Sequence, residues 1–331
     1  MGQVLSLVKI KTNVKNIILE YNKNNKGLLM QTYKDLNEAF VESLKTLSEE
    51  CTVVNSRGTK QREVLWHSIK ISDPTALSIE VPARKFKPSY GVTEWLWYLS
   101  ADPNVKNIGK LASIWQAIAD SDNEVESNYG RWIHSEPTKT GITQWQWVLE
   151  ELLNDRDTRR ASITINNSWH KGKNNKDYPC TQYLHFFIRD NKLHLGVHMR
   201  SNDAVFGFCN DVFTFCMYQQ LMLNELNHSI AANDSLEEPL KLGHYYHTAD
   251  SFHVYESHFK MMDKIVANYG KKYTTHGSWS GEPYPDLKKY VLRDTITMNQ
   301  IKETKIYLPS QELTKEELTS LANNAMELLY V

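Results

Sequence analysis

The hydrophobic positions of the chain change repeatedly between helical and strand-like spacing, which predicts an α/β protein. Apolar residues recur every three or four positions over residues 29–47, the spacing of one helix face. Elsewhere, short apolar runs bounded by polar turns predict strands. The predicted helices lie at 92–99, 142–153, 212–226 and 314–329 as well, and the predicted strands lie within 64–81, on either side of a turn at 189–192, and at 161–166 and 249–255.

One predicted helix, residues 212–226, is apolar on nearly all sides, so we expect it to be buried. A polar linker is expected to follow at 227–238. Residues 1–28 are rich in Lys and Asn and have no clear period, which indicates an N-terminal extension. A chain of 331 residues is long enough for one large domain, and we expect that domain at 29–331.

Composition narrows the class of protein. Hydrophobic residues make up 41% of the chain, enough for a large core, and the formal net charge is −1. Proteins that bind nucleic acid usually carry a basic field, so we expect no nucleic-acid partner. No apolar run approaches the roughly 18 residues of a membrane span. The four cysteines show neither metal-ligand spacing nor a disulfide framework, which favours a cytoplasmic protein without a metal.

The most informative stretch is residues 177–211. It places Cys180 after a proline at the start of one predicted strand, and Arg200 and Ser201 at the end of the next. A hairpin between these strands would bring a thiol nucleophile to an anion-binding pair, an arrangement suited to a phosphorylated substrate. The alternative is that Cys180 is a small buried hydrophobe, as free cysteines often are.

The motifs in this stretch resemble the thymidylate synthase family. Pro-Cys at 179–180 is followed by R-S-N-D-x-V-F-G-F-x-N-D at 200–211, which is similar to the phage deoxycytidylate hydroxymethylase branch. An Arg-Arg pair before a strand and a His-x-Tyr motif occur in the family's order. The resemblance covers roughly residues 29–259. It implies a three-layer α/β (α+β) fold whose large mixed sheet forms a homodimer interface on its back face.

The resemblance also implies a role for each matching residue. Cys180 would be the nucleophile, and Glu94 and Tyr129 would face the reacting centre. Trp115 and Asp203 would contact 5,10-methylenetetrahydrofolate as co-substrate. The residues implied to bind the nucleotide are Arg57, Arg159, Arg160, Arg200, Ser201, Asp211, His253 and Tyr255.

The arginines have simpler interpretations too. Arg57 lies in a polar Ser-Arg-Gly-Thr turn, and surface loops carry arginines routinely. Arg159 and Arg160 occupy a corner between a predicted helix and a strand, which is often only solvated. In the family, the double arginine reaches across the dimer interface to the phosphate site of the partner subunit.

Asp211 bears on the choice of base. The synthases carry asparagine at this position, whereas a carboxylate can accept a hydrogen bond from the amino group of cytosine and would face the carbonyl of uracil unfavourably. Asp211 would then take part in catalysis as well as binding. The alternative is that it caps the following helix.

Together these features predict hydroxymethylation of deoxycytidylate (dCMP) through a covalent Cys180 adduct. Ile118 stands where the synthases usually have a second tryptophan, and this favours addition of water over transfer of hydride. The alternative is a thymidylate synthase or hydroxymethylase acting on deoxyuridylate (dUMP). A catalytically silent nucleotide- or RNA-binding regulator is disfavoured by the intact Cys180 and Glu94.

Overall fold

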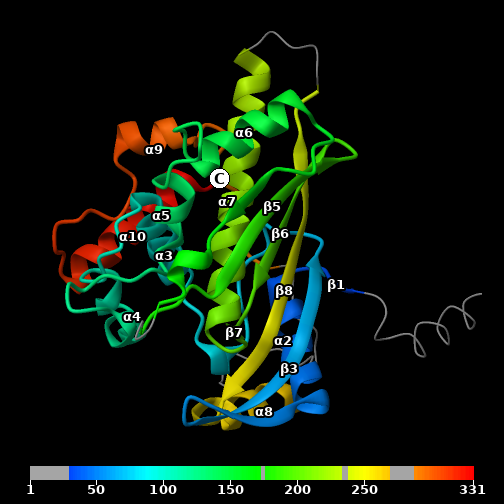
Figure 1. The fold of residues 1–331 in the computed structure, drawn as a ribbon. Coiled ribbons are helices and arrows are strands. Elements are labelled where there is room, and N and C mark those ends of the chain that lie inside the picture. The colour runs from blue at the N-terminus through cyan, green and yellow to red at the C-terminus, as the bar shows by residue number, and fades with distance from the viewer. Residues whose placement is uncertain (1–29, 173–175, 233–237, 269–286) are drawn as a thin grey trace, which may run out of the picture.

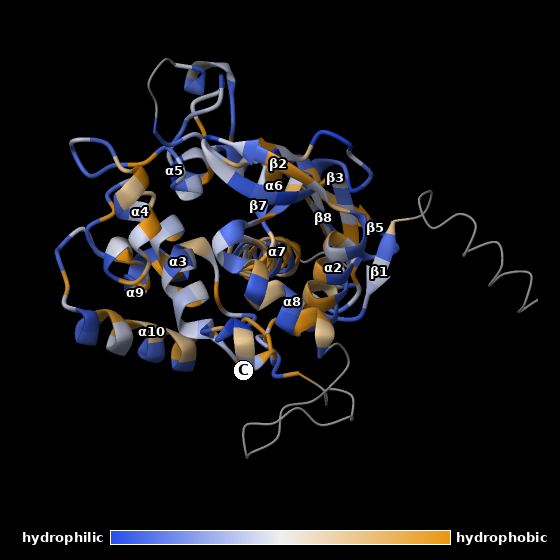
Figure 2. Cartoon of the chain, turned by 90° about the horizontal axis from the view of Figure 1, so that it is seen from below, coloured by the Kyte–Doolittle hydropathy of each residue, from blue (hydrophilic) through white to orange (hydrophobic). Residues whose placement is uncertain are grey.

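One long helix, α7 (Gly207–Ala232), passes through the centre of the molecule and is enclosed by the other elements over most of its length (Figure 1). Viewed along its axis, the sheet lies on one side of α7 and α3 (Pro88–Ser100) lies on the other (Figure 2). The computed structural model of the chain describes residues 30–172, 176–232, 238–268 and 287–331. The predicted extension at 1–28 lies outside these ranges.

The sheet is mixed, as the family resemblance implied. Its strands run in the order β1-β3-β8-β6-β5-β4, with β2 beside β3 and β7 beside β8. The β1–β3, β6–β8 and β7–β8 pairs are parallel, and the other pairs are antiparallel. The strands are β1 (Gln31–Tyr33), β2 (Thr52–Ser56), β3 (Thr59–Ile71), β4 (Ser162–Thr164), β5 (Thr181–Arg189), β6 (Lys192–Met199), β7 (Asn202–Asp203) and β8 (Lys241–Tyr255).

Shorter helices complete the layers around α7. They are α2 (Leu36–Glu50), α4 (Ser113–Ile118), α5 (Tyr129–His134), α6 (Gln144–Asn154), α8 (Phe259–Ala267), α9 (Met298–Thr304) and α10 (Lys315–Leu329). A capping box begins α10: the Glu317 backbone N–H donates to Thr314 Oγ1, and the Thr314 backbone N–H donates to the Glu317 carboxylate. These reciprocal bonds satisfy two N–H groups at the start of α10.

Three predicted boundaries were wrong. The helix predicted from residue 29 begins at Leu36, because residues 31–33 pair in parallel with β3 instead. The strand predicted within 64–81 ends at Ile71. Helix α7 extends to Ala232, so the first part of the predicted linker is helical. In each case tertiary pairing or packing overrode the local pattern.

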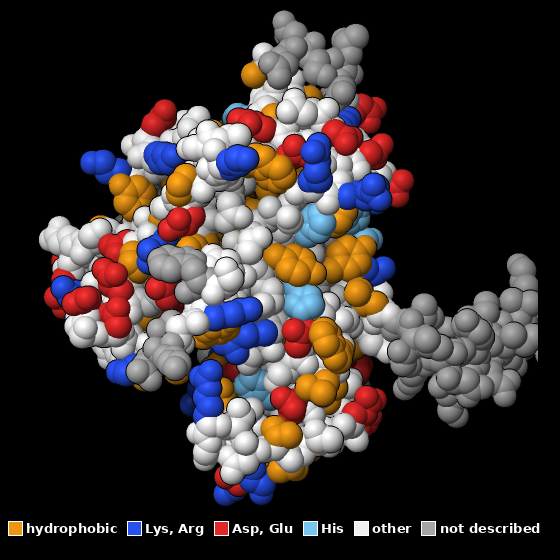
Figure 3. Space-filling view, viewed as in Figure 1, with side chains coloured by type: hydrophobic (Ala, Val, Ile, Leu, Met, Phe, Trp, Pro, Cys, Tyr) orange, Lys and Arg blue, Asp and Glu red, His pale blue; other side chains and the backbone are white. Residues whose placement is uncertain are grey.

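The two faces of the sheet have different surroundings. Along β5, β6 and β8, buried side chains that face α7 alternate with partly exposed ones on the outer face. In the space-filling view, hydrophobic and histidine side chains lie side by side over the strands of this outer face (Figure 3). They line a hollow of about 680 Å³ and include Tyr183, His185, Phe187, His194, His198, His244 and Tyr246. The homodimer expected on this face remains a prediction.

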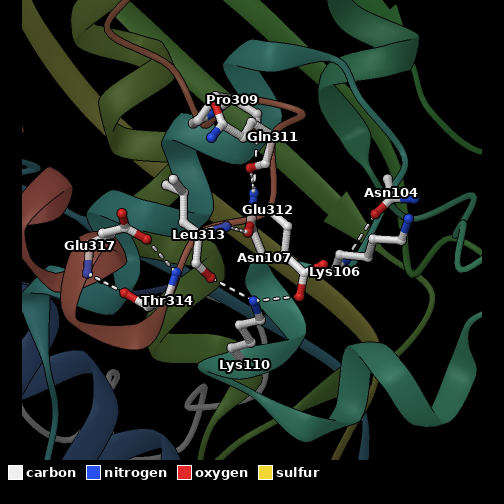
Figure 4. Close-up of polar contacts among 10 residues, drawn as sticks. All are labelled: Asn104, Lys106, Asn107, Lys110, Pro309, Gln311, Glu312, Leu313, Thr314 and Glu317. Carbon is white, nitrogen blue, oxygen red and sulfur yellow. Dashed lines mark hydrogen bonds and ion pairs between the residues drawn. The ribbon is translucent and has the colours of Figure 1, made fainter.

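The C-terminal segment packs behind the sheet against α3 and α7. Asn107 holds it in place: its Nδ2 donates to the carbonyls of Pro309 and Gln311, and its Oδ1 accepts from the Leu313 N–H (Figure 4). At the chain end, the Tyr330 hydroxyl donates to Met217 Sδ at 3.2 Å. The segment thus supports the helices that carry the candidate site.

No helix in the described part of the chain is long and apolar enough to cross a membrane.

The contact between α3 and α5 gives a stability prediction. A Cβ added to Gly130 would lie 1.5 Å from the Tyr98 carbonyl oxygen, whereas one added to Gly196 would find its nearest neighbour at 3.9 Å. We expect Gly130→Ala to lower the free energy of unfolding by about 3 kcal/mol or more, since such overpacking displaces backbone. Gly196→Ala should change it by less than about 1 kcal/mol. Urea unfolding of both variants tests this, and equal effects would contradict the packing role of Gly130.

Candidate active site

The β5–β6 hairpin brings Cys180 and Arg200 together, as the sequence predicted. Thr181 at the start of β5 pairs with Met199 at the end of β6. The Arg200 backbone N–H donates to the Cys180 carbonyl at 2.9 Å, and Arg200 Nη2 lies 3.6 Å from Cys180 Sγ. A thiol and a guanidinium therefore share one edge of the sheet.

Arg200 is held firmly in this position. Its Nε donates to the Pro179 carbonyl at 3.0 Å, and its Nη2 donates to the Tyr178 carbonyl at 2.6 Å. The guanidinium also stacks over the Tyr178 ring, 4.9 Å from its centre, in a cation–π arrangement. These contacts fix the positive charge beside the sulfur. Figure 3 shows a group of Lys and Arg side chains in the lower middle of the same face.

The electrostatic surroundings of Cys180 act in opposite directions. Burial raises the pKa of its thiol to about 11, the positive charges of Arg200 and Arg57 lower it, and the negative charges of Asp211 and Asp177 raise it. Desolvation disfavours the thiolate more than the arginines favour it. The thiol is therefore protonated at neutral pH in the free protein.

Glu94 lies in the apolar wall of α3, as its sequence context indicated. It is 4% exposed and accepts a hydrogen bond from the Tyr90 hydroxyl at 2.8 Å. Tyr90 in turn accepts from Trp115 Nε1 at 3.0 Å. Burial, with the nearby charge of Asp211, raises the pKa of Glu94 to about 8. Glu94 therefore carries a proton at neutral pH and can release it, as a general acid or base must.

Asp211 lies in the second turn of α7, which begins at Gly207. It therefore does not cap that helix, and the alternative interpretation is excluded. Its Oδ2 accepts a hydrogen bond from Asn202 Nδ2 at 2.7 Å. Burial raises the pKa of Asp211 to about 7, while the bond from Asn202 lowers it.

Tyr129 closes the wall of the site opposite the sheet. It begins α5, and its ring stacks on Tyr98 and on Phe215. Burial raises the pKa of Tyr129 well above its usual value, and the charges of Cys180 and Asp211 add to this effect. Tyr129 thus remains a neutral hydroxyl close to both groups.

Three of the other predicted residues lie at the same edge of the sheet. Arg57 occupies the β2–β3 turn with a φ of 52° beside Gly58 at 76°, the geometry of a tight two-residue hairpin loop. Within the described chain, Nε2 of the buried His253 has no hydrogen-bond partner, so it is free to bind a polar substrate group. Tyr255 follows two residues later, its ring 5.0 Å from that of His253.

Ser201 and Asp203 flank Asn202 just beyond the end of β6, and Asn202 and Asp203 form β7. Ser201 is half-buried. Asp203 accepts hydrogen bonds from the backbone N–H groups of Val205 and Phe206, each at 3.1 Å. This bonding gives Asp203 a structural role in the turn that leads into α7.

The structure does not bring Arg159 and Arg160 to Cys180 within one chain. The Phe186 N–H donates to the Ala161 carbonyl, so the pair lies beside the far end of β5. At about 3.3 Å per residue, the six residues from Cys180 to Phe186 span roughly 20 Å. Arg160 instead pairs with Glu151 at 3.1 Å, with 72% of its side chain exposed.

The sequence analysis did not identify two residues that bond to the predicted site residues Glu94 and Asp211. Tyr90 lies one helical turn before Glu94, and an i, i+4 spacing of a hydroxyl and an acid was the available signal. Asn202 lies inside the Arg-Ser-x-Asp motif, but nothing local indicated that it bonds to Asp211. In the described part of the chain, no group of three His, Cys, Asp or Glu residues is placed to hold a metal ion.

The fold and site define an enzyme class that comparisons with known proteins identify. A family model described as thymidylate synthase matches residues 38–276. The solved structure of thermostable thymidylate synthase A from Bacillus subtilis shares the fold, with a TM-score of 0.57 and 17% identity over 70% of this chain and 83% of that one. The chain therefore belongs to the thymidylate synthase family, which is a family of enzymes.

Several similar curated proteins come from phages. The deoxycytidylate 5-hydroxymethyltransferase of Enterobacteria phage T4 is 33% identical over 74% of this chain and 91% of its own length. The protein of that name from phage T2 is 32% identical over 71% of this chain and 92% of its own. The deoxyuridylate hydroxymethyltransferase of Bacillus phage SP01 is 28% identical over 80% of this chain and 70% of its own.

The Cys180–Arg200 contact predicts how fast the thiol is alkylated. Burial raises the pKa of Cys180 to about 11, and only the thiolate reacts with iodoacetamide. At pH values below that pKa, the rate of Cys180 labelling should therefore increase about tenfold for each unit by which the pH is raised. Arg200→Met removes the positive charge, so it should slow labelling at every pH.

Arg189→Met is the matched control, because Arg189 lies at the other end of the hairpin and bonds to the carbonyls of Ile188 and Asp157. It should label like the wild type. Mass spectrometry of the Cys180 peptide gives the rate. Equal rates for Arg200→Met and the wild type would show that Arg200 does not act on the sulfur.

Proposed function

We propose that this enzyme transfers a one-carbon unit to carbon 5 of dCMP and adds water, giving 5-hydroxymethyl-dCMP. The observation that carries the proposal is the carboxylate of Asp211 in the wall shared with Cys180 and Glu94. The printed names of the phage T2, T4 and T6 relatives support it. The family acts on pyrimidine nucleoside monophosphates and uses methylenetetrahydrofolate as co-substrate.

Cys180 is the nucleophile in this proposal. Its thiolate adds to carbon 6 of the pyrimidine, which makes carbon 5 electron-rich enough to attack an electrophile. Arg200, Ser201 and Arg57 bind the phosphate, and bidentate arginines suit a dianion. Fixing the phosphate positions the ring over the sulfur. His253 and Tyr255 bind the sugar.

The wall formed by α3 and α4 fits a folate. Ile114 is 58% exposed, and the neighbouring Trp115 indole is fixed by its bond to Tyr90, so both offer apolar surface to a flat ring. Asp203, whose charge acts on Asp211, is the other residue proposed to contact the folate. When bound, 5,10-methylenetetrahydrofolate would supply the one-carbon unit. Glu94, whose pKa is about 8, would move protons at the pyrimidine and guide the water.

Asp211 selects the base. As a carboxylate, it accepts a hydrogen bond from the amino group of cytosine, whereas uracil presents a carbonyl oxygen there. A second candidate is hydroxymethylation of dUMP, which the relationship to the Bacillus phage SP01 protein favours. The two differ in which nucleotide is consumed, so one experiment separates them.

That experiment incubates the protein with methylenetetrahydrofolate and either dCMP or dUMP, and identifies the product by mass. We expect 5-hydroxymethyl-dCMP, and Asp211→Asn should shift the ratio of kcat/KM values toward dUMP by roughly tenfold to a hundredfold, the value of one well-placed hydrogen-bond pair. A wild type that consumes only dUMP would overturn the dCMP assignment. An equal loss on both bases in Asp211→Asn would exclude base recognition by this residue.

Arg159 and Arg160 are proposed to act in trans across a homodimer. Their distance from Cys180 within one chain is consistent with this, as is the uncovered outer face of the sheet. Cys180→Ser and Arg160→Ala proteins should each lose activity alone. Mixed and allowed to exchange subunits, they should recover about a quarter of wild-type activity, because half of the symmetric dimers become hybrids with one complete site.

The control mixes Arg160→Ala with the double variant Cys180→Ser/Arg160→Ala, which yields no complete site and should recover nothing. Subunit exchange is verified by native mass spectrometry of differently tagged chains. Demonstrated exchange without recovered activity would exclude a shared role for Arg160.

A further inference from the structure

A buried chain of hydrogen bonds ends at Asp211. The Tyr245 hydroxyl lies 3.0 Å from His247 Nδ1, and His247 Nε2 lies 3.0 Å from Asn202 Oδ1. Asn202 Nδ2 then lies 2.7 Å from Asp211 Oδ2. Tyr245 and His247 are fully buried, and Asn202 is 3% exposed.

The hydrogen bonds of this chain all point toward Asp211. Burial, together with the charges of His67 and His198, lowers the pKa of His247 to about 3, so its ring is neutral and carries one N–H. With the Asn202 Nδ2 group donating to Asp211, Oδ1 can only accept, so the proton of His247 is on Nε2. His247 Nδ1 therefore accepts from Tyr245, whose hydroxyl keeps its proton because burial raises its pKa.

We propose that Tyr245, His247 and Asn202 are positioning residues that hold Oδ2 of Asp211 as a hydrogen-bond acceptor, and so set the preference for an amino group over a carbonyl on the pyrimidine. The proposal rests on the proposed function and explains how its base selection is maintained. Any proton on Asp211 must then be carried by Oδ1. Asn202 alone cannot hold Oδ2 as an acceptor, because its amide could rotate and present its oxygen to Asp211 instead. The hydrogen bond from His247 to Asn202 Oδ1 prevents that rotation.

The surroundings of Asp211 explain why such support is needed. Glu94, Tyr90 and Tyr98 from α3, Tyr129 from α5, Cys180 and Asp203 all interact electrostatically with it. Burial and the charge of Asp203 raise the pKa of Asp211 to about 7, against the bond from Asn202. A protonated Asp211 would donate to the carbonyl of uracil. Loss of the chain should therefore admit dUMP, and the preference for dCMP should rise with pH through the pKa of Asp211.

The test compares two variants of His247. His247→Leu removes the donor to Asn202, whereas His247→Gln keeps an N–H at a similar distance from the backbone. Tyr245→Phe is the milder change farther along the chain. The matched control is His67→Leu, since His67 is also a buried strand histidine, bonded to Ser43 Oγ at 2.9 Å and stacked on Phe252, but it makes no hydrogen bond in the chain.

The first measurement is the ratio of kcat/KM for dCMP to that for dUMP. His247→Leu should lower the ratio about tenfold, because it frees the Asn202 amide to rotate and so weakens the hydrogen bond from Asn202 to the charged Asp211. His247→Gln and His67→Leu should keep it, and Tyr245→Phe should have an intermediate effect. A ratio that stays unchanged in His247→Leu, or that falls equally in His67→Leu, would overturn the proposal.

The second measurement needs no nucleotide. The Asp211 carboxyl signal of ¹³C-aspartate-labelled protein is assigned by its absence in Asp211→Asn and titrated by NMR. Its midpoint should rise by about one pH unit in His247→Leu and stay put in His247→Gln. If the wild type does not prefer dCMP, the proposed function fails, but the titration midpoint still tests whether the hydrogen bonds act on Asp211. An unchanged midpoint in His247→Leu would overturn the positioning role of His247.

Discussion

The architecture depends on one constraint, which is that α7 must be kept from water over most of its length. Sixteen of its side chains are buried, and burying that much apolar surface is the main favourable term in folding. The sheet covers one side, and α2, α3 and α6 cover the others. Three side-chain amides that α7 carries into the core donate to carbonyls: Gln219 to those of the strands, and Gln220 and Asn224 to those of the C-terminal segment. These bonds join the outer layers to the central helix.

The candidate site forms where this enclosed helix begins. Groups that enter the core there are desolvated, so the pKa values of Asp211 and Glu94 rise into the range near neutrality, where proton transfer is efficient. The same burial keeps the Cys180 thiol protonated until other charges favour its ionisation. Reactivity and stability thus have one physical origin, because the packing that encloses α7 also creates the low-dielectric wall of the site.

The sequence carried enough local information for the parts of the site that depend on neighbouring residues. A hairpin between two apolar runs dictated that Cys180 meets Arg200, and a carboxyl among aromatic residues dictated that Glu94 is buried. Contacts set by sheet register were not readable. His247 and Tyr245 are two apart on β8, so they share a face, but their link to Asn202 depends on how β7 lies beside β8. Likewise, residues 31–33 continue a helical pattern, and only their pairing with β3 makes them a strand.

The close approach of α5 to α3 at Gly130 bears on how the site can diverge among relatives. The Tyr98 carbonyl leaves no room for any side chain at position 130, so Tyr129 on one helix and Glu94 on the other keep a fixed separation. Drift in sequence cannot widen that gap without loss of folding. New specificity must therefore arise on the facing wall, which carries Asp211 and Asn202. There, an exchange between aspartate and asparagine changes the hydrogen-bonding groups but hardly changes the size of the side chain. The rigid wall preserves the chemistry, and the polar wall is free to change the substrate.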